Sequence, residues 1–334
     1  MPRKMTVPSA PAENFHIARG DARGIDGGPL EGAVVAIGNF DGVHRGHRAV
    51  IGAAVRRARK LGRRAAALTF TPHPRLFLRP QEPLFQLSGE RDKLRLLAAS
   101  GLDGAIVMKF DAALASTSAK DFIEKILVQA LRIGGAAIGF DFHFGKNRAG
   151  SPAFLADQGA KLGFAVDVVP PLEDEGRPVS SGAIRAALTA GRVVEAAELL
   201  GAPWFVSGEV IHGDKRGRDL GFPTANLKLD PSCGLKHGIY AVRVAIAGVH
   251  HDGVASFGRR PMFDDGAPLL EVHLFDFDDD LYGQTIDVAF IGWIRQEQKF
   301  ESIEILKRQM TSDTIKARDS LKRAGKAFPR LRDI

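Results

Sequence analysis

The chain has 334 residues, which is more than one hydrophobic core usually organises, so we expect two domains. Hydrophobic residues make up 45% and charged residues 25%, a composition typical of a globular protein that excludes a fibrous or intrinsically disordered one. The excess of 46 basic over 39 acidic residues, a formal net charge of +7, suits a polyanionic ligand, either phosphates or nucleic acid.

The N-terminal stretch and the cysteine count bear on the compartment. The single cysteine, Cys233, excludes an intrachain disulfide and a thiolate metal cluster. The sequence has no run of 18 apolar residues and no apolar core of a secretory signal near its start. We therefore expect a cytoplasmic protein with no membrane span. Residues 1–28, rich in Pro, Gly, Ala and charged residues, predict a mobile N-terminal arm.

From about residue 29, short apolar runs alternate with amphipathic segments. The runs occupy residues 32–37, 65–70, 104–108, 135–140 and 164–169. One amphipathic segment opens with Ser118 and an aspartate three residues later, which indicates a helix N-terminus. This alternation predicts an α/β domain with a parallel sheet and right-handed crossovers. Ligands of such sheets bind at the carboxyl ends of the strands.

The first apolar run leads into GNFDGVHRGH, in which His44 and His47 stand at the expected start of a helix. Glycines at 38, 42 and 46 (Gly38, Gly42 and Gly46) let the backbone turn tightly and approach a ligand. The free N–H groups of a helix start attract anions, and two imidazoles can add donors that stabilise a pentacovalent phosphorus. The pattern predicts a phosphate site. The alternatives are a surface turn whose imidazoles face water, and a metal site that lacks a third ligand at usable spacing.

Three further clusters fall where the same cleft is expected. TFTPHP (69–74) and GFDFHFG (139–145) follow the second and fourth apolar runs, and VSSGAIR (179–185) opens a connecting helix. Alone, each is equally well explained as a turn, as core residues or as a helix cap. Together, such clusters at successive strand ends favour a ligand site.

The second half has a different pattern. Residues 183–200 predict one or two connecting helices with a break at Gly191, and residues 187–203 serve as a helical linker. After Pro203, residues 204–213, 238–248, 268–277 and 285–294 read as strands separated by turns. They predict a small antiparallel β-barrel within 204–334, and residues 300–324 have the apolar spacing of a closing amphipathic helix.

Candidate chemistry in this half gathers in GEVIHGDKRGRDLGFPTANLKL (208–229). Glycines at 213, 217 and 221 (Gly213, Gly217 and Gly221) suit backbone amides wrapped around phosphates. Thr224 and Asn226, two apart in an extended segment, offer the oxygen ligands that Mg²⁺ prefers. The alternative is a flexible hairpin loop. Glu271 lies in the middle of a predicted strand, where most glutamates are solvated.

The motifs GNFDGVHRGH, TFTPHP, GFDFHFGKNRAG and SSGAIR resemble the nucleotidyltransferase module of prokaryotic bifunctional riboflavin kinase/FMN adenylyltransferases, the FAD synthetases. The resemblance implies a Rossmann-like nucleotidyltransferase domain over 29–186, in which His44, His47 and Arg185 act on the ATP phosphates. It also implies two groups of binding residues. Those for ATP and its phosphates are Gly38, Phe40, Gly42, Gly46 and Ser181, and those lining the FMN and ATP pockets are Asn39, Asp41, His73 and Asp141. Gly182 stands where the family usually has threonine.

The motifs HGDKRGRDLGFPTANL, GIYAVRV, LEVHLFDF, LYGQTIDV and IRQEQKF resemble the riboflavin kinase module, in the order of the bifunctional enzymes. This resemblance implies that Thr224 and Asn226 hold Mg-ATP and that Glu271 is the general base on the 5′ hydroxyl of riboflavin. It also implies that Arg295 helps to secure the flavin. Met262 replaces a usual threonine, and Ser-Phe-Gly at 256–258 replaces Asn-Ile-Gly.

The predicted function is therefore FAD synthesis in two steps. The module at 204–334 makes FMN from riboflavin and ATP, and the module at 29–186 makes FAD and pyrophosphate from FMN and ATP. The predicted cofactor is Mg²⁺, and the predicted partners are small molecules, without nucleic acid or membrane. One alternative is an enzyme with a single active module, given Gly182 and Met262. The other is a nucleic-acid-binding protein, but its basic run at 56–64 lacks interleaved aromatic residues.

Overall fold

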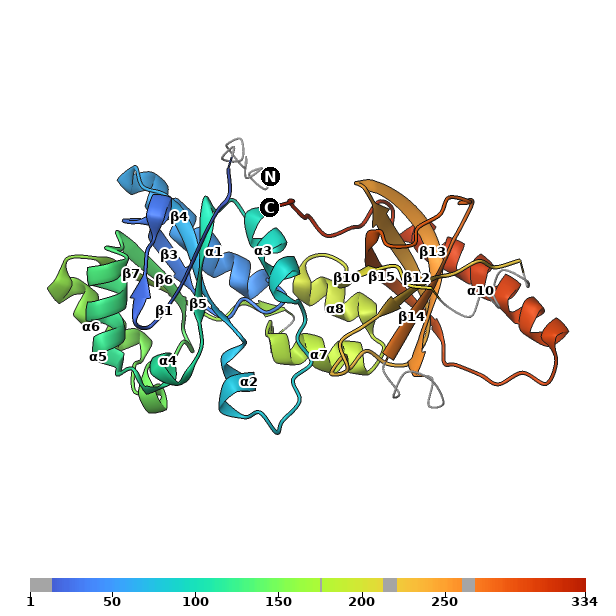
Figure 1. Ribbon diagram of the computed structural model, residues 1–334, viewed down its shortest axis with the longest axis horizontal. Coiled ribbons are helices and arrows are strands. Elements are labelled where there is room, and N and C mark those ends of the chain that lie inside the picture. Colours follow the sequence, from blue (N-terminus) through green and yellow to red (C-terminus); the bar gives the residue numbers. More distant parts are fainter. Residues whose placement is uncertain (1–13, 175, 213–220, 260–267) are drawn as a thin grey trace. The chain divides into compact units, whose positions relative to one another are not determined.

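The computed structural model describes residues 14–174, 176–212, 221–259 and 268–334 (Figure 1). The chain divides into two compact units, which are described separately. The first consists of Met1–Glu82, Lys93–Leu172 and Leu331–Ile334, and the second of Pro83–Asp92 and Glu173–Arg330. Residues 173–203 pack with the second unit. The predicted domain boundaries, after residue 186 and after residue 203, stay predictions.

The first unit is built on a seven-stranded sheet with the strand order β2-β1-β5-β4-β3-β6-β7. Its strands are β1 (His16–Asp21), β2 (Gly24–Ile25), β3 (Val34–Ile37), β4 (Ala65–Thr71), β5 (Gly104–Lys109), β6 (Gly135–Gly139) and β7 (Ala165–Val169). Every neighbouring pair is parallel except β1 with β2. The predicted Rossmann-like parallel sheet is confirmed, and each of the five apolar runs forms a strand.

The predicted mobile arm is wrong for residues 16–28. Residues 16–20 pair in parallel with residues 104–108 of β5, and β2 folds back on β1 as an antiparallel edge. Gly28–Leu30 then forms a 3₁₀ turn, from which Leu30 enters the core with 1% of its surface exposed. Backbone pairing and one anchored side chain order this segment despite its polar composition.

Helices cover both faces of this sheet (Figure 1). On one face α1 (Arg45–Leu61) packs on β3, β4, β6 and β7. On the other, a π-helical segment (Phe122–Ala130) and α6 (Pro152–Leu162) share a core with side chains from the sheet. The central strands β3, β5 and β6 are buried at nearly every position, which explains their apolar runs. The remaining helices are α2 (Pro74–Leu78), α3 (Glu90–Ala98), α4 (Ala112–Ser116) and α5 (Ala119–Asp121), which Ser118 caps as predicted.

The described part of the second unit contains the helices α7, α8 and α10, a short hairpin and a six-stranded antiparallel sheet that nearly closes. Its strands follow the order β10-β15-β12-β13-β14-β11, and the backbone of Ile211 bridges to Asn226 to join the two edges. The elements are β8 (Glu173–Asp174), β9 (Arg177–Pro178), α7 (Ser181–Thr189), α8 (Val193–Leu200), β10 (Phe205–Glu209), β11 (Ala225–Lys228), β12 (Gly238–Ile246), β13 (Val249–Arg259), β14 (Pro268–Leu274), β15 (Thr285–Arg295) and α10 (Ile303–Arg323). The predicted barrel with a terminal helix is confirmed, and Gly191 separates α7 from α8 as predicted.

The long helix α10 packs on β12, β13 and β15. The outer face of β12 is therefore covered, and Arg243 on that face is only 6% exposed. Its guanidinium donates to Asp252 (2.7 Å) and to the backbone oxygen of Ala327 (3.1 Å). These acceptors satisfy a charge that would otherwise be costly to bury. Within the described residues, no helix is long and apolar enough to cross a membrane; the cytoplasmic location stays a prediction.

Candidate functional site

The turn between β3 and α1 is a tight, buried loop at the carboxyl end of a central strand. Gly42 adopts a φ of +79°, and two non-glycine residues, Phe40 and Val43, also have positive φ angles of 51° and 42°. Such angles are uncommon for Phe and a real outlier for the β-branched Val. Both side chains are buried, with 1% and 0% exposure. Strained backbone of this kind persists where its surroundings fix it and occurs frequently at ligand sites.

His44 is the N-cap of α1, the last residue before the helix. Its Nδ1 accepts a hydrogen bond of 3.3 Å from the backbone N–H of His47. Because Nδ1 is the acceptor, the proton of the neutral His44 ring is on Nε2. The predicted helix start is therefore confirmed, and the histidine that caps it also presents a donor.

The two imidazoles stack, with 3.6 Å between ring centroids, and the Phe40 ring meets His47 edge-on at 5.3 Å. Burial lowers the pKa of His47 well below its usual range, and the nearby His44 and Lys93 lower it further. The His47 ring is therefore neutral at physiological pH. Its buried Nδ1 has no hydrogen-bond partner among the described residues, which leaves a polar atom available to a ligand.

The other predicted residues of the first unit lie at the same edge of the sheet. Asp41 follows β3, His73 follows β4 and Asp141 follows β6, and these three strands are neighbours. Asp41 is buried, with 4% exposure, whereas Asp141 is exposed. His73 caps α2, since its Nδ1 accepts from the backbone N–H of Arg75 at 3.2 Å. The structure thus brings these residues to one edge, as expected for the carboxyl ends of parallel strands.

Ser181 and Arg185 lie on α7, which belongs to the second unit. The N-cap of this helix is Ser180, whose hydroxyl accepts from the backbone N–H of Ala183 at 3.2 Å, so Ser181 is the first helical residue. Nε of Arg185 donates to the backbone oxygen of Phe85 at 2.6 Å. At Gly182, the nearest atom to an added Cβ would be the Ser180 hydroxyl at 3.7 Å, so a side chain would fit there.

In the barrel, Asn226 on β11 lies directly opposite Glu271 on β14. Residues that face one another in an antiparallel ladder project to the same side, so their side chains share one face. Thr224 directly precedes β11 and lines the same cavity as Asn226. The Asn226 side chain is 4% exposed, and its Nδ2 donates to the backbone oxygen of Thr224 at 3.4 Å. Its buried Oδ1 has no hydrogen-bond partner among the described residues.

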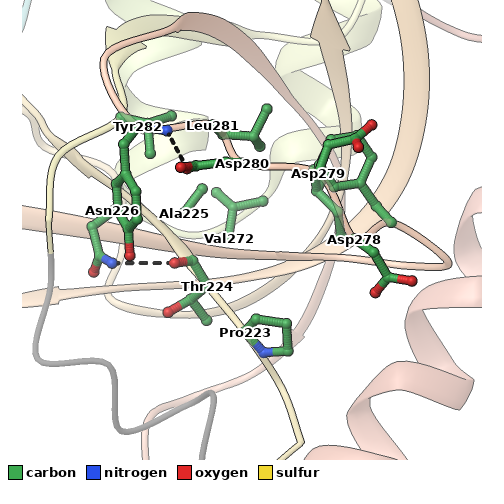
Figure 2. A pocket seen from close by; sticks show the side chains of 13 residues that line it. Pro223, Thr224, Ala225, Asn226, Val272, Asp278, Asp279, Asp280, Leu281 and Tyr282 are labelled. Carbon is green, nitrogen blue, oxygen red and sulfur yellow. Dashed lines mark hydrogen bonds between the residues drawn. The ribbon is translucent and has the colours of Figure 1, made fainter.

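A cavity of about 300 Å³ adjoins Thr224 and Asn226 (Figure 2). Its wall includes the loop between β14 and β15, with Asp278, Asp279 and Asp280, and the ring of Tyr282. In Figure 2 this ring lies beside Asn226, while Asp278 and Asp279 stand on the other side of the pocket. Asp280 is turned into its own loop, where it accepts from the backbone N–H of Tyr282 at 3.0 Å. Asn226 lines this cavity and pairs with Glu271, whereas β14 itself contributes Val272 and Leu274 to the wall.

The glycine-rich loop is described only at its end. Gly221 has a φ of +85°, a conformation that favours glycine, and is exposed. Gly213, Gly217 and Met262 lie outside the described residues.

Arg295 has a structural partner that the sequence analysis did not predict. Its guanidinium donates to Asp313 of α10 through Nε (2.9 Å) and Nη2 (2.7 Å), and Nη1 donates to the backbone oxygen of Gln296. Both side chains are largely buried, with 14% and 4% exposure. This bidentate pair fixes α10 to the end of β15, and the flavin-binding role of Arg295 stays a prediction.

Two further charged residues near these sites were missed from the sequence. Lys93 is buried next to the β3–α1 turn, with 7% exposure, although a lysine on an amphipathic helix usually indicates a solvated face. Glu297 places its carboxylate over Gly258, where an added Cβ would meet it. Gly258 is two residues from Ser256, which pairs with Glu271, so this carboxylate is on the face of Glu271. Partial burial raises the pKa of Glu297, and Glu271 contributes to the rise.

Comparison with known proteins covers both units. The family model described as FAD synthetase matches residues 28–183, and the model described as riboflavin kinase matches residues 200–321. The bifunctional riboflavin kinase/FMN adenylyltransferase of Escherichia coli (strain K12) is 41% identical over 293 residues, which are 87% of this chain and 93% of that protein. The protein of the same name from Bacillus subtilis (strain 168) is 39% identical over 291 residues, 85% of this chain and 91% of its own length.

A solved structure has a similar fold. The crystal structure of a macrolide-efflux protein from Streptococcus pneumoniae superposes with a TM-score of 0.79 at 34% sequence identity, covering 87% of this chain and 95% of that one. The covered share of the chain includes residues of both units.

Proposed function

The chain belongs to the family of bifunctional riboflavin kinase/FMN adenylyltransferases, and from this premise we propose which of its residues act in each reaction. The enzyme phosphorylates riboflavin with ATP to give FMN, and then adenylylates FMN with a second ATP to give FAD and pyrophosphate. The alternatives of a single active module and of a nucleic-acid-binding protein receive no support from the comparisons.

For the kinase step, Glu271 is the general base. It takes the proton of the 5′ hydroxyl of riboflavin while that oxygen forms a bond to the γ-phosphorus of ATP, and the bond from this phosphorus to the β–γ bridging oxygen breaks to release ADP. A primary hydroxyl is a poor nucleophile at neutral pH, so a base within hydrogen-bond reach is needed. The observation that supports Glu271 is its position in the ladder opposite Asn226, which is one of the residues that line the pocket.

Thr224 and Asn226 are the proposed Mg²⁺ ligands. The buried Oδ1 of Asn226 fits this role, because its amide nitrogen is turned to the Thr224 backbone and the oxygen has no donor among the described residues. Hard oxygen donors suit this cation. When bound with ATP, Mg²⁺ would neutralise charge on the phosphates. The amides of Gly213, Gly217 and Gly221 are proposed to surround those phosphates, and Arg295 to help secure the flavin.

The magnesium assignment can be tested by titrating Mg²⁺ in the kinase assay. Asn226→Ala should raise the Mg²⁺ concentration needed for half-maximal FMN formation, because a ligand oxygen is lost. Lys228→Ala, at an exposed position two residues later on the same strand, is the matched control and should leave the titration unchanged. An unshifted titration in Asn226→Ala would remove this residue from the metal site.

For the adenylyl transfer, a phosphate oxygen of FMN attacks the α-phosphorus of ATP, and the bond to the α–β bridging oxygen breaks to release pyrophosphate. No covalent enzyme intermediate is needed, since the phosphate is already an adequate nucleophile. His44, His47 and the start of α1 stabilise the added charge on phosphorus as fixed donors, together with Arg185 and Ser181. The backbone of Gly38, Phe40, Gly42 and Gly46 shapes the turn around the phosphates, and Asn39, Asp41, His73 and Asp141 line the flavin and nucleotide pockets.

Supplying the enzyme with riboflavin and Mg-ATP, and separating the flavins with time, tests the whole assignment. FMN should form first and FAD should follow. Variants of the β3–α1 turn should let FMN accumulate, whereas variants at Glu271 should block its formation but still convert added FMN. The opposite pattern would mean that the two sets of residues are assigned to the wrong steps.

A further inference from the structure

Lys93, on α3, is a buried charge for which the two reactions as described have no use. Its ammonium donates to the hydroxyl of Thr69 and to the backbone oxygen of Phe70, both at 3.2 Å, and reaches the backbone oxygen of Asn39 at 3.5 Å. Lysine is rarely buried to this extent unless polar partners compensate for the lost hydration. All three partners lie at the carboxyl ends of β3 and β4, which is the edge that carries the β3–α1 turn.

These contacts converge on one carbonyl group. Thr69 accepts from Lys93 and in turn donates its hydroxyl proton to the Asn39 oxygen at 3.2 Å, so two donors hold that oxygen. Asn39 directly precedes Phe40, the first of the two non-glycine residues with positive φ. A backbone strained in this way costs about 1–3 kcal/mol at each residue and relaxes unless neighbouring groups fix it. Lys93 on α3 and Thr69 on the neighbouring strand β4 are such groups.

The ammonium also lies close enough to affect the histidine pair. Lys93 is one of the causes that lower the pKa of His47, after burial and the neighbouring His44. A fixed positive charge in a poorly solvated position attracts phosphate oxygens more strongly than a surface lysine would. Because the ammonium is already held in place, it does not have to move when negative charge develops on the phosphate oxygens during adenylyl transfer.

We infer that Lys93 is a positioning residue of the FMN adenylyltransferase reaction. Its ammonium, with Thr69, fixes the Asn39 carbonyl and so the strained turn that presents His44 and His47 to the ATP phosphates. It also places an ammonium group behind that turn. This role rests on the proposed phosphate-binding function of the turn.

Lys93→Met tests the inference, because methionine keeps a long unbranched side chain and removes the ammonium charge and its hydrogen-bond donors. With added FMN and ATP, kcat for FAD formation should fall about 10²-fold, the loss typical of misplacing reacting groups by about 1 Å. The dissociation constants of FMN and ATP, measured by flavin fluorescence and calorimetry, should change only a few-fold. Lys60→Met, at an exposed lysine near the end of α1, is the matched control and should leave all values unchanged.

A second readout distinguishes positioning from general support of the fold. His44 and Lys93 are the titratable groups that act on the buried His47 ring, and the uncharged Phe40 packs against it. Loss of the Lys93 charge should therefore move the pKa of His47 upward, towards its ordinary value, in an NMR titration of the imidazole protons. Thr69→Val keeps the ammonium and removes the hydroxyl that holds Asn39. It should lower kcat less than Lys93→Met and leave the His47 titration in place.

The outcomes separate this inference from the proposed function. If His47→Ala loses FAD formation but Lys93→Met retains wild-type kcat, the inference about Lys93 is overturned and the turn keeps its role. If both variants are fully active, the proposed phosphate site itself is wrong. If Lys93→Met loses ligand binding together with activity, and Thr69→Val is fully active, Lys93 only supports the fold and the inference is also overturned.

Discussion

Replacing His47 by alanine removes one imidazole and keeps the start of α1, so it tests the contribution of the side chain alone. The His47 ring stacks on His44 and touches Phe40, but the hydrogen bond that caps α1 uses the backbone N–H of residue 47 and Nδ1 of His44. An alanine keeps that backbone donor. The variant should therefore preserve the turn and the cap, and lose only the side chain that is proposed to bind the ATP phosphates.

The expected magnitude follows from this geometry. Loss of one fixed donor to a developing oxyanion typically lowers kcat by about 10²–10³-fold, or about 2.7–4 kcal/mol. The effect on folding should be small by comparison. Removing the ring loses packing, but it also removes the buried Nδ1 that has no partner among the described residues, and such an atom costs about 1–3 kcal/mol. These two contributions oppose each other, so activity should fall far more than stability.

The assay measures both reactions on one preparation. FAD formation is followed from added FMN and ATP, and FMN formation from riboflavin, with thermal unfolding recorded alongside. His16→Ala is the matched control, because His16 begins β1 at the amino end of the sheet, opposite the edge that carries the turn. Adenylylation within a few-fold of wild type in His47→Ala would refute the reasoning and return this histidine to a merely structural role.

The remaining predictions concern both units. Glu271→Gln should lower FMN formation by about 10²–10⁴-fold while FAD formation from added FMN stays near wild type, and a kinase that survives within a few-fold would make Glu271 a structural carboxylate. Arg295→Met should lower the free energy of unfolding of the second unit by about 3–5 kcal/mol in chemical denaturation, because it leaves Asp313 buried without its charge partner. An unchanged denaturation midpoint would show that this ion pair contributes nothing to stability. The pKa of His47 is lowered on folding, so the folded state binds fewer protons than the unfolded state, and the stability of the protein falls as the pH drops below 6.5. The thermal midpoint of His47→Asn should therefore depend less on pH in this range than that of the wild type. Equal pH dependence of the two midpoints would contradict the shift. Gly182→Thr should fold normally, since an added Cβ meets nothing closer than 3.7 Å, and should lower the KM for ATP if the family's usual hydroxyl contacts phosphate.

The sequence predicted the parallel sheet well because its central strands are buried on both faces. Apolar runs such as residues 32–37 have no polar positions to confuse with a helix pattern. β1, with the sequence HIARGD, lies near the sheet edge, pairs through its backbone and keeps alternate side chains partly exposed, so its composition resembles that of a loop. β13 was missed for a similar reason, because VHHDGVASFGR is polar and contains two glycines.

Charged residues that meet across the fold were the hardest to predict. The ion pair of Arg295 with Asp313 joins the end of a strand to a helix 18 residues later, and nothing in the local pattern marks it. Lys93 lies in an amphipathic helix, where a lysine is normally solvated, and only the tertiary contacts reveal its burial. The motif residues, in contrast, follow strand ends directly, so the parallel topology alone brought Asp41, His73 and Asp141 to one edge.

The near closure of the barrel bears on how its site exchanges with solvent. In the described part of the chain, a single bridge joins the β10 side of the barrel to β11: the backbone N–H of Ile211 donates to the backbone oxygen of Asn226 at 2.8 Å. By comparison, β12 pairs with β13 over nine residues. Local opening requires the least free energy where the fewest backbone bonds must break, so this junction opens more readily than the ladders around it. The side chain of Asn226 is the proposed metal ligand, and a ligand that binds only the closed form makes opening rarer. Slower hydrogen exchange of the Ile211 amide would therefore report occupancy of the kinase site without any measurement of turnover.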